Sequence, residues 1–119
     1  MLSSEGYNTN MIVRVAEGVR FDRLTTELFW IAEAYWYAAM QEGTIGVITG
    51  AQDRTYDTGK AHRDGRALDL RSRDMHDPFR AAGMIRVLLK DRGLDATVLF
   101  GPPDHTDHIH VHYVPRCGT

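Results

Sequence analysis

Two segments of the chain carry apolar residues at the spacing of an amphipathic helix. In the first, residues 24–40, apolar side chains recur every three or four positions, which is typical of a helix with one buried face. Asp22 precedes this segment as a candidate N-cap, and Gly43 follows it as a typical C-terminal stop. The members of the apolar face are Leu24, Leu28, Ile31, Tyr35 and Ala38.

The second helical segment begins at Asp77-Pro78. An aspartate N-cap followed by proline at the first helical position is a common helix start. Gly93 is expected to end this helix. Its predicted apolar face consists of Phe79, Ala82, Ile85 and Leu89.

Short apolar segments between and beside the two helices predict strands. Residues 50–66 form a polar stretch that predicts a loop. Together these elements predict an α+β fold, with a small antiparallel sheet packed against two main helices, in a single domain over residues 1–119. The predicted strands are 11–15, 45–49, 67–71, 97–100 and 108–114.

Composition narrows the class of protein. The 119 residues have a formal net charge of −2, and lysine and arginine are scattered along the chain, which argues against nucleic acid as a partner. No apolar run is long enough to span a membrane, and residues 1–10 lack the features of a signal peptide. We therefore expect a chain made in the cytoplasm without a signal peptide, and a monomer. Because Cys117 is the one cysteine, a metal site must use histidine, aspartate or glutamate.

Histidine is concentrated in two places. Five of the six histidines lie in residues 62–69 and 104–112. On a strand, alternate residues share a face, so His108, His110 and His112 are predicted to lie side by side. Three imidazoles on one strand face are unusual in a protein core. The other face of this strand is predicted to be apolar: Ile109, Val111 and Tyr113.

Asp69 lies within the apolar strand segment 67–71. A buried carboxylate is costly unless it is paired, here with a nearby arginine, or binds a metal ion. Gly65 allows a tight turn between His62 and Asp69. With one strand histidine, these two residues complete three protein ligands, the number that a catalytic zinc site uses while leaving one position open. Spacing alone does not decide whether His108 or His112 lies beside His110 at the metal.

The same residues carry a family resemblance. The segment Lys60 to Arg71 contains His-x-x-Gly-x-Ala-x-Asp, and Asp107 to Val111 contains His-Ile-His-Val. In combination these motifs resemble the M15-type zinc peptidases, over roughly residues 45–115. That family includes D-alanyl-D-alanine carboxypeptidases, dipeptidases and phage endolysin endopeptidases, and the hedgehog signalling domain shares its fold and zinc site. The resemblance implies a small α+β domain with an antiparallel sheet.

The resemblance also implies roles for individual residues. Asp107, three residues before the third ligand, matches the catalytic carboxylate, and Asp104 matches a less common placement six residues before it. His108 is expected to donate to the reaction intermediate or to orient Asp107. The second nitrogen of a zinc-bound histidine needs an acceptor, for which Asp104, Asp64 and backbone carbonyls are candidates. The implied zinc ligands are His62, Asp69 and His110.

Two positions depart from the family pattern. Lys60-Ala61 stands where a serine often precedes the first histidine. Tyr56 stands where many relatives have a histidine or arginine that stabilises the oxyanion, and we expect Tyr56 and Arg54 near the substrate.

The function implied is that of a zinc metallopeptidase that hydrolyses a peptide bond in peptidoglycan stem peptides. It would act on the cell wall, either as an endolysin-like endopeptidase or as a DD-carboxypeptidase. The alternative is a non-catalytic, zinc-containing module of the same fold that is either a binding module or associated with a virion. Asp107 favours the enzyme, because a module without catalysis has no need of a carboxylate beside the metal.

Overall fold

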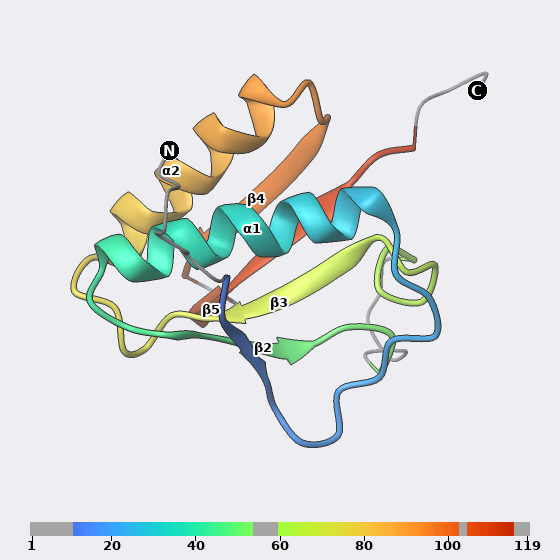
Figure 1. The fold of residues 1–119 in the computed structure, drawn as a ribbon, viewed down its shortest axis with the longest axis horizontal. Helices are drawn as coiled ribbons and strands as arrows, with labels where there is room; N and C mark the ends of the chain where they lie inside the picture. The colour runs from blue at the N-terminus through green and yellow to red at the C-terminus, as the bar shows by residue number, and fades with distance from the viewer. Residues whose placement is uncertain (1–10, 54–59, 103–104, 116–119) are drawn as a thin grey trace, which may run out of the picture.

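Two helices and a five-stranded sheet form the protein in the computed structural model, which describes residues 11–53, 60–102 and 105–115 (Figure 1). The predicted α+β class is confirmed, and each predicted helix and strand is present; the ends of the strand at residues 67–71 are as predicted, and those of most other elements differ by a few residues. The helices are α1 (Thr26–Gln41) and α2 (Pro78–Asp91). The strands are β1 (Val13–Val15), β2 (Gly46–Gly50), β3 (Ala67–Arg71), β4 (Ala96–Gly101) and β5 (His105–Tyr113).

The sheet is mixed, so the prediction of an antiparallel sheet is wrong at one edge. Its strand order is β1-β2-β3-β5-β4, and β1 runs parallel to β2 while the other neighbours are antiparallel. A parallel pair needs a crossover connection, and α1 supplies it between β1 and β2. The alternation of side chains along a strand is the same whether its neighbour is parallel or antiparallel, so the pattern of β1 did not reveal its direction.

The start of α1 differs from the prediction. Thr25 is the N-cap, and its side-chain oxygen accepts a hydrogen bond from the Leu28 N–H at 3.1 Å. Asp22 lies before the helix, where its backbone N–H donates to the side-chain oxygen of Gln52 at 2.7 Å. Gly43 follows the helix with a φ of +79°, a conformation that favours glycine.

The boundaries of α2 are as predicted. Asp77 is the N-cap and accepts from the Arg80 N–H at 3.1 Å, and Gly93 follows the helix with a φ of +79°. Phe79 differs from the prediction because its side chain is largely exposed, with its ring edge-on to that of Phe100. The other predicted members of the apolar face are buried: Ala82, Ile85 and Leu89.

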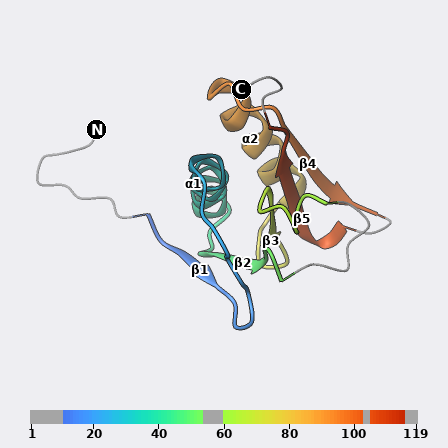
Figure 2. The same ribbon diagram turned by 90° about the vertical axis from the view of Figure 1, so that its right-hand side faces the viewer.

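Both helices cover the same face of the sheet (Figures 1 and 2). The side chains packed beneath them come from alternate positions of β3 and β5, and they form the centre of the core. Neither helix of the described residues lies over the other face of β3 and β5, which we call the uncovered face (Figure 2). None of the helices in the described part of the chain has the length and apolar character needed to cross a membrane. The central core residues of the two strands are Leu68, Leu70, Ile109 and Val111.

Candidate metal centre

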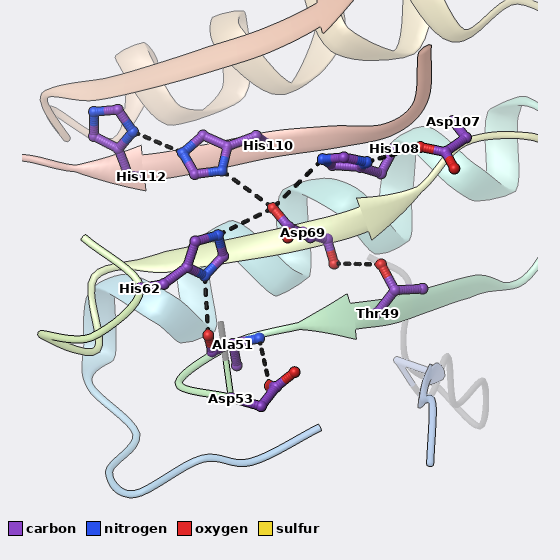
Figure 3. A network of polar contacts seen from close by, with 9 residues as sticks. All are labelled: Thr49, Ala51, Asp53, His62, Asp69, Asp107, His108, His110 and His112. Atoms are coloured by element: carbon purple, nitrogen blue, oxygen red, sulfur yellow. Dashed lines mark hydrogen bonds and ion pairs between the residues drawn. The ribbon is translucent and has the colours of Figure 1, made fainter. Parts of the chain in front are cut away.

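The register between β3 and β5 sets the positions of the site residues. Asp69 pairs with His110 and Ala67 pairs with His112 in this antiparallel ladder. Since Leu68 and its neighbours at alternate positions face the helices, Asp69 and the strand histidines face the opposite side. Figure 3 shows His108, His110 and His112 in a row on this uncovered face, as the sequence predicts.

A tight turn brings His62 to the same place. The Gly65 N–H donates to the His62 carbonyl at 3.1 Å, and the Arg66 N–H donates to the Ala61 carbonyl at 2.7 Å. Gly65 has a φ of +76°, which a residue with a side chain adopts only at a cost, so the predicted role of this glycine is confirmed. The His62 side chain is almost fully buried at 2 % exposure.

Both nitrogens of the His62 ring face acceptors. Nδ1 lies 3.0 Å from the carbonyl oxygen of Ala51, and Nε2 lies 3.1 Å from Oδ1 of Asp69. A carbonyl oxygen only accepts, so Nδ1 carries a hydrogen and donates it. In a neutral ring, Nε2 then presents a lone pair toward a carboxylate oxygen. The Nε2 lone pair and the Asp69 oxygen repel each other at 3.1 Å unless a proton or a metal ion lies between them.

Three imidazoles converge on Oδ1 of Asp69 (Figure 3). His62 Nε2 and His110 Nδ1 each lie 3.1 Å away, and His108 Nε2 lies 3.8 Å away. Burial of Asp69 opposes ionisation, but the contacts with His110 and His62 and the nearby charge of His108 hold the pKa of this carboxyl well below its ordinary range. The site is therefore a buried carboxylate surrounded by ring nitrogens.

These residues fit a metal ion. The candidate donor atoms of His62, Asp69 and His110 all lie within 4.8 Å of one another. In a tetrahedral zinc site with bonds of about 2.0–2.2 Å, neighbouring ligand atoms lie roughly 3.3 Å apart. The separation of 3.1 Å between Asp69 Oδ1 and each of the two nitrogens is close to that value. The three residues predicted as ligands are thus brought together in a group that can hold a metal ion.

His112 contacts the group through His110. Its Nδ1 lies 2.9 Å from His110 Nε2, and the two ring centroids are 5.1 Å apart with planes tilted by 61°. Burial lowers the pKa of His112, and the charge of His110 lowers it further. His110 is the strand histidine whose nitrogen lies in the donor group with His62 and Asp69.

Asp107 lies next to His108 and is not part of the donor group. Its Oδ1 is 2.9 Å from His108 Nδ1, and this hydrogen bond lowers the pKa of the Asp107 carboxyl. The Asp107 side chain is 78 % exposed. His108 therefore lies between the Asp107 carboxylate and Asp69, as Figure 3 shows.

The register of β5 against β4 is irregular where Asp107 lies. Leu99 pairs with His110, but Gly101 pairs with His105, so the register between β4 and β5 shifts between these two pairs. Such a bulge frees a residue from strict alternation. Asp107 can for this reason lie beside His108 on the uncovered face.

Some predicted residues lie outside the described residues: Arg54, Tyr56 and Asp104. Of the predicted acceptors for the zinc-bound histidines, Asp64 instead contacts Arg66, with 3.4 Å between its Oδ2 and Nη2. The acceptor for His62 is the Ala51 carbonyl, and Thr49 Oγ1 donates to the backbone carbonyl of Asp69 at 3.4 Å. The sequence predicted a backbone carbonyl as one possible acceptor but did not identify Ala51, and it missed the Thr49 contact, because both depend on where β2 ends beside β3.

Comparison of the chain with protein-family models, with curated proteins and with solved structures found no match. The class of site is therefore defined by its own chemistry, which is that of a buried group of two histidines and one aspartate able to hold a metal ion.

Proposed function

We propose that this protein is a zinc metallopeptidase that hydrolyses a peptide bond in peptidoglycan stem peptides. The observation that supports a metal most directly is the convergence of His62 Nε2 and His110 Nδ1 on one oxygen of Asp69. Two imidazoles and a carboxylate suit zinc, and a set of three protein ligands leaves a position open for chemistry.

A bound zinc ion would supply a Lewis acid that polarises the scissile carbonyl and lowers the pKa of a water molecule. The chain itself supplies access to this position. His108 and His110 lie on the sheet face that neither α1 nor α2 covers, and the His108 side chain is 26 % exposed. An extended peptide can lie along this face and present its carbonyl to the donor group.

Asp107 and His108 are proposed to do the acid–base work as a pair. A general base must reach the reacting proton directly or through one water molecule. The contact between Asp107 Oδ1 and His108 Nδ1 leaves His108 Nε2 directed toward Asp69. In this arrangement Asp107 accepts the proton itself, or it holds His108 in the orientation in which Nε2 accepts it.

The substrate class is supported by the motif resemblance alone. His-x-x-Gly-x-Ala-x-Asp followed by His-Ile-His-Val resembles peptidases that act near D-amino acids, either within the stem peptide or at its end. The proposal therefore includes both an endopeptidase and a DD-carboxypeptidase, and the products of digestion distinguish them.

The experiment is to measure zinc in the purified protein by elemental analysis and to digest purified muropeptides with the zinc-loaded chain. Mass spectrometry of the products identifies the bond that is cut. Cleavage by the unmodified chain and none by the Asp69→Ala variant supports the proposal. A chain that binds no zinc contradicts the metal centre.

A second candidate function is a zinc-containing binding module of the same fold. The observation in its favour is the exposure of Asp107, whose carboxylate contacts His108 and is not part of the donor group. Stoichiometric zinc without cleavage of any muropeptide would favour this candidate.

A further inference from the structure

The two histidine ligands of the proposed zinc centre each need a partner on the ring nitrogen that does not face the metal. A ligand nitrogen must present a lone pair, so the hydrogen of a neutral imidazole lies on the other nitrogen and needs an acceptor. For His62 the acceptor is the Ala51 carbonyl oxygen, 3.0 Å from Nδ1. For His110 the nitrogen that faces Asp69 is Nδ1, which leaves Nε2 to find a partner.

We propose that His112 is a positioning residue that accepts a hydrogen bond from His110 Nε2 and thereby determines which His110 nitrogen faces the metal. This inference rests on the proposed zinc centre, although it does not depend on peptidase activity. The separation of 2.9 Å between His110 Nε2 and His112 Nδ1 is that of a hydrogen bond. The two histidine ligands then use opposite nitrogens, His62 Nε2 and His110 Nδ1.

The sheet holds this pair of rings in place. β5 lies between β3 and β4, and His112 pairs with Ala67 on one side and with Thr97 on the other. Residues two apart on a strand share a face, with their Cα atoms roughly 6.6 Å apart. The planes of the two rings are tilted by 61°, an edge-on arrangement in which one ring directs a nitrogen at the other.

A direct role of His112 as a metal ligand fits these contacts less well. Its Nδ1 is within hydrogen-bond distance of His110 Nε2, which is the nitrogen of His110 opposite the donor group. The donor atoms that cluster within 4.8 Å belong to His62, Asp69 and His110. His112 thus contacts a ligand, in the way that carboxylates and backbone carbonyls orient zinc-bound histidines in other proteins.

The test compares two variants of nearly equal size. In His112→Asn, an amide oxygen can take the place of Nδ1 as acceptor, whereas His112→Leu has a similar shape and no acceptor. Zinc affinity is measured on the full chain by competition with a chromophoric chelator. We expect His112→Leu to bind zinc about 10–100-fold more weakly and His112→Asn to stay within about threefold of the unmodified chain.

His76→Leu is the matched control, because His76 is an exposed histidine before α2. It should leave zinc affinity unchanged. Thermal unfolding of each metal-free variant shows whether the chain still folds.

A second measurement does not depend on any variant. Long-range proton–nitrogen NMR of the zinc-loaded chain reports which nitrogen of each imidazole carries the hydrogen. We expect the hydrogen of His110 on Nε2 and that of His62 on Nδ1. This measurement decides the question if His112→Leu fails to fold.

Three results would overturn the inference. Equal zinc affinity in His112→Leu and the unmodified chain means that the acceptor is not needed. Equal loss in His112→Leu and His112→Asn means that His112 is itself a ligand. A hydrogen on Nδ1 of His110 in the zinc-loaded chain assigns the opposite nitrogen to the metal. If the unmodified chain binds no zinc, the proposed function fails together with the inference, and that result is known before any variant is made.

Discussion

Asp69 and His110 lie directly opposite each other on β3 and β5, with 3.1 Å between Oδ1 and Nδ1. These residues are 41 positions apart in the chain, and the hydrogen bonds of the central ladder hold them together. Two of the three proposed ligands are therefore positioned by regular sheet structure before any metal binds. The third, His62, lies in a turn, and the Ala51 carbonyl accepts a hydrogen bond from its ring.

Removal of any one proposed ligand should abolish stoichiometric zinc. Asp69→Asn is the sharpest of these variants, because it keeps the size of the side chain and removes the charge on which the imidazoles converge. Elemental analysis after dialysis should give about one zinc for the unmodified chain and far less for His62→Ala, Asp69→Asn and His110→Ala. His76→Ala is the control and should keep its zinc. Full zinc content in Asp69→Asn would mean that the metal is bound elsewhere.

Loss of the Asp107 carboxylate should separate catalysis from metal binding. Because Asp107 lies outside the donor group, Asp107→Ala should keep zinc and lose about 10²–10⁴-fold in turnover, the usual contribution of a positioned acid–base group. The measurement is kcat on a purified muropeptide together with zinc content. Near-normal turnover in Asp107→Ala, with a large loss in His108→Ala, would assign the base to His108.

Glu42 should make stability depend on pH through its ion pair with Arg80, in which the carboxylate is buried and the guanidinium is exposed. Its side chain is fully buried and accepts hydrogen bonds from the Asp77 N–H and from Arg80, which join the end of α1 to the start of α2. The Arg80 contact lowers the pKa of Glu42 below its unfolded value, about 4.3. The stabilisation is therefore present above that pH and is lost as the pH falls through the folded-state pKa.

Glu42→Gln should reduce the free energy of unfolding by about 1–3 kcal/mol at pH 7, the range for hydrogen bonds to charged groups. The difference from the unmodified chain should shrink as the pH falls below about 4. Urea unfolding at pH 7 and at pH 3 measures both values. Glu33→Gln is the control, since Glu33 on the same helix forms an exposed pair with Arg92 and should change stability by less than about 1 kcal/mol. A pH-independent effect of Glu42→Gln would contradict the role of its charge.

Gly65→Ala should destabilise the turn that positions His62. A left-handed backbone costs a residue with a side chain about 1–2 kcal/mol, and Gly65 has a φ of +76°. Asparagine tolerates this conformation better, so Gly65→Asn should lose less. Thermal unfolding and zinc affinity are the measurements, and both should decrease in the order glycine, asparagine, alanine. Equal behaviour of all three proteins would mean that the turn adapts without strain.

The sequence by itself determined the features that depend on neighbours along the chain. The apolar spacing predicted both helices, and Asp77, Gly43 and Gly93 marked their ends because capping acts over one turn. Period-two alternation predicted the shared face of His108 and His110. Spacing placed a histidine and an aspartate beside a strand of histidines, and the motif resemblance selected His110 among these as the third member of the group that the fold brings together.

Only the tertiary structure decided the features that depend on residues distant in the chain. The side-chain pattern of a strand is the same in parallel and antiparallel pairs, so the direction of β1 followed from the α1 crossover. The Asp22 backbone N–H donates to the Gln52 side chain, and Thr25 caps α1 in its place. The acceptors of the two histidine ligands, the Ala51 carbonyl and His112, depend on the ends and registers of three strands. Local pattern cannot specify such contacts, because each exists only once strands from separate parts of the chain have paired.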